Sequence, residues 1–235
     1  FSKMESKTYK VISKEFSLAQ CLQTVHRIAT AYAQQLNIFL QIDADDRIPD
    51  VLEGDPRMLQ QLLLNIISNA VKASVEKDVV VVTVRLNRSS DVANRLVILE
   101  FSVKDHGPGI PAEKQHLLFQ PFSQLNTIPD RKIPSTGLGL AICKKLVESI
   151  NGDIRIETST EVDNHGTTVS VIAPYKVSDK LGHNQSESQI ADDKNLIQRM
   201  IQSKRYYLEA YKRCENDDAV STPTSSDYIS NNEIP

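Results

Sequence analysis

The sequence predicts an α/β fold, a two-layer sandwich in which helices cover one face of a mixed, mostly antiparallel sheet. Three observations support this class. Residues 55–74 have the apolar period of an amphipathic helix. β-Branched runs at 79–86 and 95–104 flank a short polar loop, which predicts an antiparallel pair of strands. Apolar and polar residues alternate on both sides of a turn at 164–166, which predicts a terminal hairpin with one buried face.

The elements before the central helix follow from the same kinds of pattern. Residues 11–16 predict a strand, and Ser17 is a suitable N-cap for a helix after it. Residues 37–43 predict a second strand, followed by a turn at 45–49. The predicted first helix has one apolar face, made of Leu18, Leu22, Val25, Ile28, Ala29, Tyr32 and Leu36.

The central helix carries a polar stripe opposite its apolar face. Its members are Gln61, Asn65, Ser68, Asn69 and Lys72. Such a stripe is usually a solvated face, yet solvated faces mostly carry Glu, Lys and Arg. Two amides four residues apart, with an ammonium group one turn later, suit a hard cation and a polyphosphate. On this helix alone both interpretations stay open.

Two glycine motifs follow the helix. The strand at 96–104 leads into Asp105-His-Gly-Pro-Gly-Ile110, and Ser135-Thr-Gly-Leu-Gly-Leu140 opens a helical pattern that runs to residue 150. Between them lie a Phe-Gln-Pro-Phe segment at 119–122 and a long polar stretch with three prolines at 120–135. A helix N-terminus preceded by glycines suits phosphate oxygens. Four motifs in this order are far more specific than any one of them.

These blocks resemble the N, G1, F and G2 boxes of the catalytic, ATP-binding domain of sensor histidine kinases. That domain has the Bergerat fold, which DNA gyrase and the heat-shock chaperone ATPases share. The similarity covers roughly residues 10–175, and the Phe-Gln-Pro-Phe-Ser-Gln form of the F box is similar to that of hybrid kinases. The resemblance implies an enzyme that transfers the γ-phosphoryl group of ATP to a histidine.

The resemblance also implies roles for the G1 residues. Asp105 would accept a hydrogen bond from the exocyclic amine of adenine, which guanine lacks. Gly107 and Gly109 would let the backbone approach the base, with Ile110 completing the motif. The bland alternative is a tight turn whose aspartate bonds only local backbone. Thr167 matches the adenine-side threonine of the family, although an ordinary strand threonine is nearly as good an interpretation.

For the phosphates, the resemblance implies contacts from the G2 loop and the F box. The residues concerned are Phe119, Thr136, Gly137, Leu138, Gly139 and Leu140. The loop departs from the family pattern at Ser135, where glycine is usual. If the backbone there needs a positive φ, serine costs about 1 kcal/mol. The polar stretch at 120–135 matches the ATP lid of the family, and Arg131 and Lys132 in it are candidates for the γ-phosphate or simply solvated.

The N box implies the metal and the type of reaction. Asn69 is the expected Mg²⁺ ligand, and Lys72 would neutralise phosphate charge. Asn65 stands where hydrolytic relatives have a water-activating Glu, and an amide is no base near neutral pH. Asn65 and Lys72 are therefore the expected catalytic residues of phosphoryl transfer to an external nucleophile. A hydrolytic ATPase and a nucleotide-binding scaffold without transfer are the alternatives.

No histidine of this chain lies in an acceptor-like sequence, so the resemblance implies a partner. A dimerisation and phosphoacceptor domain, in cis or in trans, would supply the histidine, and a receiver domain would take the phosphoryl group onward. The full-length protein is expected to be a homodimer. The net charge of −3 gives no reason to expect a nucleic-acid partner.

The expected organisation has five parts. Residues 1–10 resemble the end of the phosphoacceptor helix, 11–175 form the catalytic domain and 176–189 a linker. An amphipathic helix is expected at 190–214, as an output connector or docked on the domain, and a disordered tail at 215–235. Isolated cysteines and the absence of a long apolar run indicate a cytoplasmic segment. A first residue other than Met suggests a piece of a longer protein, and a membrane-anchored parent is compatible with this.

Overall fold

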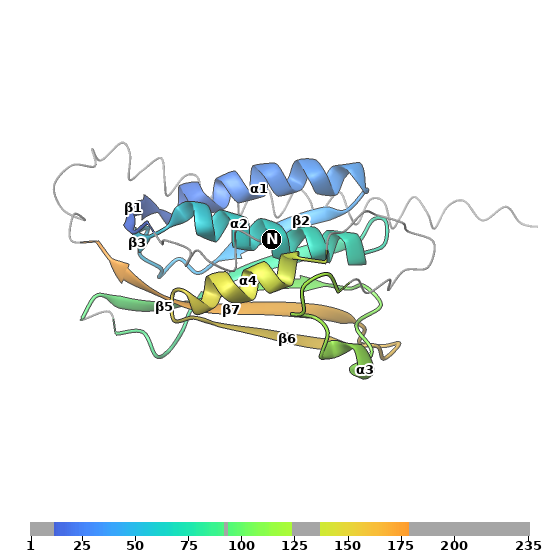
Figure 1. Cartoon of the computed structure of the whole chain (residues 1–235). Helices are drawn as coiled ribbons and strands as arrows, with labels where there is room; N and C mark the ends of the chain where they lie inside the picture. Colours follow the sequence, from blue (N-terminus) through green and yellow to red (C-terminus); the bar gives the residue numbers. More distant parts are fainter. Residues whose placement is uncertain (1–11, 92–93, 124–136, 179–235) are drawn as a thin grey trace, which may run out of the picture.

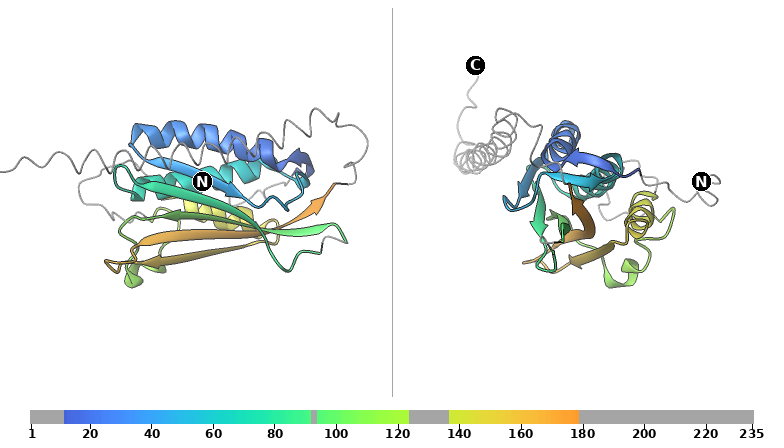
Figure 2. Two further views of the ribbon diagram at one scale, coloured as in Figure 1. Left: turned by 180° about the vertical axis from the view of Figure 1, so that it is seen from behind. Right: turned by 90° about the vertical axis from the view of Figure 1, so that its left-hand side faces the viewer.

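A computed structural model describes residues 12–91, 94–123 and 137–178. Within these ranges seven strands form one sheet, and three long helices cover one of its faces (Figures 1 and 2). The predicted two-layer α/β sandwich is therefore confirmed. The segments expected at 1–10, 190–214 and 215–235 lie outside the described residues. No helix in the described ranges is both long and apolar enough to span a membrane.

The sheet is mixed and mostly antiparallel, as predicted. Its order is β1 (Lys14–Ser17), β3 (Val51–Gly54), β7 (Gly166–Val177), β5 (Leu96–Asp105), β4 (Val79–Leu86) and β2 (Phe39–Ala44), with β6 (Asp153–Ser159) also paired to β7. Only β2 and β4 pair in parallel among these strands. Residue Thr167 on β7 lies opposite Asp105, the last residue of β5. The register therefore brings two predicted site residues together.

The helices are α1 (Leu18–Gln35), α2 (Pro56–Ala73), a short α3 (Ala112–Gln115) that was not predicted, and α4 (Gly139–Glu148). Both predicted N-caps are confirmed. The Ser17 hydroxyl accepts the Gln20 N–H, and Asp55 accepts the N–H groups of Arg57 and Met58. Because proline lacks an N–H, Pro56 fits the first turn of α2 without cost. Helix α2 packs against α1 on one side and α4 on the other.

The core lies between the helices and the sheet. Alternate residues of β4 and β5 point to it, among them Val80, Val82, Leu99 and Phe101, and α2 contributes Leu63 and Ile66. Full burial of each such side chain stabilises the fold by about 1.5–3 kcal/mol. The prediction for α1 is wrong at Ile28, which is 46% exposed. The packed face of α1 is the narrower row of Val25, Ala29 and Ala33, so Ile28 falls at its margin.

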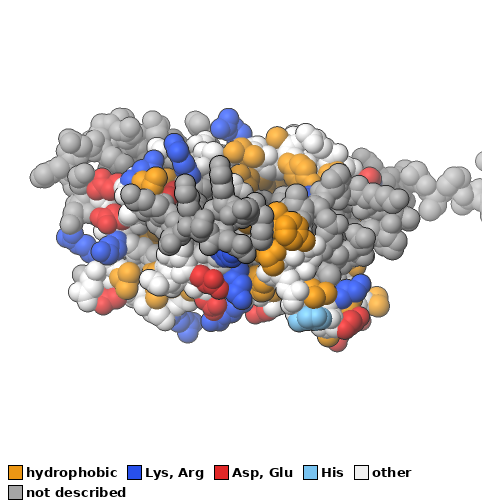
Figure 3. Space-filling view, viewed as in Figure 1, with side chains coloured by type: hydrophobic (Ala, Val, Ile, Leu, Met, Phe, Trp, Pro, Cys, Tyr) orange, Lys and Arg blue, Asp and Glu red, His pale blue; other side chains and the backbone are white. Residues whose placement is uncertain are grey.

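Two further features of the described residues concern the surface and the end of the domain. Acidic and basic side chains are interspersed over the described surface visible in Figure 3. Strand β7 continues to Val177, beyond the expected domain end at residue 175. The buried Ser178 then donates its N–H to the carbonyl of Val51.

Candidate functional site

The polar stripe of α2 is not a solvated face. Asn65, Asn69 and Lys72 are half-buried, and the exposed Gln61 donates a hydrogen bond of 3.0 Å to Asn65 Oδ1. The Asn65 Nδ2 atom is buried and has no hydrogen-bond partner among the described residues. Buried polar groups are nearly always paired, so this amide marks a place where a ligand acceptor is missing.

Asp105 is a buried carboxylate at the end of β5, only 4% exposed. Its Oδ1 accepts the N–H of Gly107 at 3.0 Å and that of Thr167 at 3.2 Å. Burial raises the pKa of Asp105 to about 6, and the two backbone donors limit that rise. Among the described residues Oδ2 makes no hydrogen bond, so the turn-forming role predicted as the bland alternative uses one oxygen and leaves the other for a ligand.

A hydroxyl cluster beside Asp105 contains a residue that the sequence did not single out, Thr158. Its Oγ1 accepts the Ile110 N–H at 2.9 Å, donates to the Gly166 carbonyl at 3.0 Å and lies 3.0 Å from Thr167 Oγ1. Because Thr158 has one hydroxyl proton, Thr167 must be the donor between the two hydroxyls. Thr167 thereby keeps its lone pairs as acceptors. The only sequence signal for Thr158 is its place opposite Thr167 in the predicted hairpin.

The G1 glycines are required by close backbone approach. A Cβ on Gly107 would collide with the carbonyl oxygen of Ala73 in the last turn of α2, and Gly109 has φ +71° and lies against the Ser159 carbonyl. Side chains other than hydrogen are excluded at both positions. The adenine-side loop is thus fixed to the same helix that carries Asn65 and Asn69, and Asn69 lies one turn before Ala73, about 6 Å along the axis.

The G2 segment meets α2 at Asn69. A Cβ on Gly139, the first residue of α4, would lie 3.5 Å from Asn69 Nδ2 and 3.9 Å from its Oδ1. Gly137 has φ +65°, and no side chain caps the N-terminus of α4. The flanking Leu138 and Leu140 are half-buried. The free N–H groups of the helix and the Asn69 amide therefore lie together, whereas Thr136 lies outside the described residues.

Two other side chains complete the surroundings. Phe119 lies beneath Lys144 of α4, whose Nζ is 5.3 Å from the ring centroid, a cation–π contact that fixes the F box to α4. The Cys143 thiol lies between α2 and α4 and donates to the Leu62 carbonyl. Burial raises its pKa to about 12, so it is a packed thiol and no nucleophile.

The donor set is that of a nucleotide site. Within the described ranges no three His, Cys, Asp or Glu side chains gather to hold a metal ion. Amide oxygens on α2, free N–H groups at α4 and a buried acceptor at β5 instead lie along one helix. This arrangement suits, in turn, a metal bound together with phosphates, the phosphates themselves and a base that donates an amine hydrogen bond.

Comparisons with known proteins agree with this geometry. Residues 54–177 match the family described as histidine kinase-, DNA gyrase B- and HSP90-like ATPase. The chain is 36% identical over 160 residues to the sensor histidine kinase RcsC of Escherichia coli, covering 67% of this chain and 16% of RcsC. It is 32% identical over 174 residues to hybrid signal transduction histidine kinase B of Dictyostelium discoideum, covering 74% of this chain and 8% of that protein. The chain thus spans a small part of these relatives.

Solved structures show the same fold. The catalytic domain of histidine kinase ThkA aligns with a TM-score of 0.55 at 25% identity, covering 69% of this chain and 95% of that domain. Full-length ShkA in complex with AMPPNP aligns with a TM-score of 0.62 at 22% identity, covering 75% of this chain and 34% of ShkA. The chain therefore belongs to the histidine kinase-, DNA gyrase B- and HSP90-like ATPase family and is homologous to the ATP-binding catalytic domains of sensor histidine kinases.

Proposed function

We propose that the described residues form the phosphotransfer domain of a hybrid sensor histidine kinase, which passes the γ-phosphoryl group of ATP to a histidine on a separate domain. The observation that carries this proposal is the position of α2. Its Ala73 lies against the adenine-side loop at Gly107, and its Asn69 lies against the phosphate-side helix at Gly139. One nucleotide can span these two contacts.

The base is recognised at the end of β5. The free Oδ2 of ionised Asp105 accepts the exocyclic amine of adenine, and Thr167 offers a second acceptor beside it. A guanine carbonyl at the same place would face the carboxylate and be repelled. The close packing of Gly107 and Gly109 holds the loop in position, so adenine enters a site that is already formed.

The triphosphate end fits Mg²⁺ as well as the phosphates. Asn69 would hold the ion through its amide oxygen, and the unpartnered Asn65 Nδ2 would donate to a phosphate oxygen or orient the acceptor. Bound Mg²⁺ supplies charge neutralisation at the phosphate oxygens. Lys72 adds positive charge from α2, and the N-terminus of α4 donates its free N–H groups. Phe119, Leu138, Leu140 and Ile110 enclose the nucleotide.

Transfer is favoured over hydrolysis because of Asn65. An amide cannot take a proton from water near neutral pH, so the site holds the γ-phosphoryl group for an external nucleophile. That nucleophile is a histidine on a dimerisation and phosphoacceptor hairpin, which acts in cis or from a homodimer partner. A receiver domain is the next acceptor, and the domain works in the cytoplasm, also within a membrane-anchored parent. Residues 1–10 then lead in from the hairpin, and 178–189 lead out.

The direct test is radiolabelled transfer from ATP to a supplied acceptor hairpin. Wild type is expected to label the hairpin, whereas Asn69→Ala is expected to lose transfer and to bind Mg-ATP more weakly. Asn87→Ala, at the far end of β5, serves as the matched control. Unchanged transfer in Asn69→Ala would remove the metal assignment. Nucleotide binding without transfer by wild type would identify a scaffold, and steady phosphate release without the hairpin would identify a hydrolase.

A further inference from the structure

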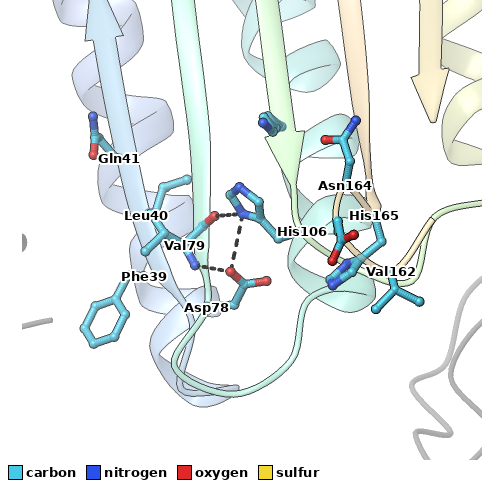
Figure 4. Close-up of a pocket in the computed structure, with 11 residues that line it drawn as sticks. Phe39, Leu40, Gln41, Asp78, Val79, His106, Val162, Asn164 and His165 are labelled. Atoms are coloured by element: carbon cyan, nitrogen blue, oxygen red, sulfur yellow. Dashed lines mark hydrogen bonds and ion pairs between the residues drawn. The ribbon is translucent and has the colours of Figure 1, made fainter. Parts of the chain in front are cut away.

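A cavity of about 570 Å³ lies on the sheet face that carries no helices. It sits at the ends of β2, β4 and β5 beside the β6–β7 turn, and Figure 4 shows it with the helices behind the strands. This volume is within the range of sites for small molecules. Asn69 and α4 belong to the opposite layer, so the cavity is separate from the proposed phosphate site.

The walls combine apolar surface with an unmet acceptor. Phe39, Val79 and the 88% exposed Val162 supply apolar contacts. Asp78 Oδ1 accepts the Val79 N–H at 2.7 Å and lies 3.4 Å from His106 Nδ1. Its Oδ2 is buried without a hydrogen-bond partner among the described residues. A buried acceptor left without a donor costs about 1–3 kcal/mol, so a ligand that brings a donor would relieve this cost.

Two histidines add further acceptors. His106 Nδ1 faces the Val79 carbonyl at 3.2 Å and the Asp78 carboxylate, and His165 Nδ1 is 2.8 Å from the Gly107 carbonyl. Carbonyl and carboxylate oxygens only accept, so both rings carry their proton on Nδ1 and leave Nε2 as an acceptor when neutral. Among the lining residues, the carboxylates of Asp78 and Asp163 outnumber the single ammonium group of Lys104.

We infer that this cavity is an effector site for a small organic cation, an ammonium or guanidinium group on an apolar body. The cation would meet Asp78 and Asp163, and the apolar body would cover Phe39 and Val162. Carboxylate ligands are disfavoured because the walls already present more negative than positive charge at neutral pH. The chemistry of the walls thus selects a ligand class that the nucleotide itself does not belong to.

The cavity shares its inner wall with the adenine-side loop. His165 holds the Gly107 carbonyl, and the N–H of the same residue is held by Asp105 Oδ1. A ligand that fixes the His165 ring also fixes this loop, and its positive charge favours ionised Asp105. Occupation therefore raises nucleotide affinity, and by linkage nucleotide raises affinity for the cation. This coupling rests on the adenine role proposed above for Asp105, whereas binding of the cation does not.

The test titrates the 235-residue chain with phenethylamine and, as the matched anion, with 3-phenylpropanoate, following backbone amide shifts by NMR. Phenethylamine is expected to give saturable shifts at His106 and His165, and the anion none. Val162→Lys places an ammonium group over the cavity and is expected to abolish these shifts. Ile28→Lys on α1 introduces the same charge on the helical layer and is expected to leave them unchanged. Mg-ATP affinity at saturating amine is expected to rise about threefold in wild type and Ile28→Lys alone.

Each contrary result has a separate meaning. Equal responses to the amine and the carboxylate, or none to the amine, would overturn the ligand class. Saturable amine binding with an unchanged Mg-ATP affinity would overturn the coupling. Amine binding by a wild-type chain that fails to bind Mg-ATP would instead overturn the proposed function and leave the cation site standing.

Discussion

At the scale of single residues, Asp105 is the most informative side chain. Its burial and its backbone bonds act against each other, because burial favours the protonated form and the N–H groups favour the ionised one. The raised pKa of about 6 means that the folded protein binds this proton more tightly than the unfolded chain does. The contribution of Asp105 to stability is therefore full below pH 4 and is lost as the pH rises through 6.

This sign gives a stability prediction. Between pH 4 and pH 7 the free energy of unfolding of wild type is expected to fall relative to that of Asp105→Asn, by on the order of 3 kcal/mol at about 1.4 kcal/mol per pKa unit. Asparagine keeps the acceptor for Gly107 and Thr167 but does not titrate. Urea unfolding of both proteins across this range measures the difference. Parallel stability curves would show that Asp105 has an ordinary pKa.

The same ionisation controls recognition of the base. Because the adenine amine needs a charged acceptor, adenosine affinity is expected to be about tenfold higher at pH 7 than at pH 5, given a pKa near 6. Adenosine carries no phosphate that could titrate in this range. In Asp105→Asn the pH dependence is expected to disappear, together with the preference for ATP over GTP. Calorimetric titration tests both, and an unchanged preference in the variant would contradict the role of the carboxylate.

Gly139 separates the needs of folding from those of binding. A Cβ there meets Asn69 at an ordinary distance of 3.5 Å and the glycine has no positive φ, so Gly139→Ala is expected to fold and to keep wild-type stability. The added methyl group, however, occupies space beside Asn69 where a phosphate would lie. Weaker Mg-ATP binding with an unchanged melting temperature is expected, and unaltered affinity would place the phosphates elsewhere.

At the scale of elements, α2 was largely predictable because its apolar period, its Asp55 cap and its polar stripe agree. The sequence could not show that the stripe is half-buried, because this depends on α4 and the G1 loop packing against the same helix. Thr158 escaped prediction for a related reason. Its hydroxyl gains a role only when the hairpin brings it to Ile110, a contact between residues far apart in the chain.

The cap of α2 can be tested as an element. Asp55 is 6% exposed and also accepts the N–H of Ile12, so it fixes the start of α2 to the strand region before α1. Asp55→Ala is expected to lower the free energy of unfolding by about 1–2 kcal/mol. The more exposed cap of α1, removed in Ser17→Ala, is the control and is expected to cost less. Equal losses in denaturant melts would show that burial of the cap is irrelevant.

At the scale of the whole molecule, the sandwich and its mostly antiparallel sheet followed from patterns of apolar residues. The order of the strands did not, because the parallel pair β2–β4 and the central place of β7 depend on contacts between distant segments. The error at Ile28 has a similar origin. A helical face can be read from periodicity, but its width depends on which neighbours cover it. The helix-free cavity also arises only when three strand ends and a hairpin meet.

The central claim is that one nucleotide joins the two ends of α2. A crystal structure of the chain with Mg²⁺ and a non-hydrolysable ATP analogue tests it most directly. The claim predicts the adenine amine within about 2.7–3.2 Å of Asp105 and the Asn69 amide oxygen at about 2.0–2.1 Å from the ion. An analogue bound away from either residue, or an ion held without Asn69, would contradict it.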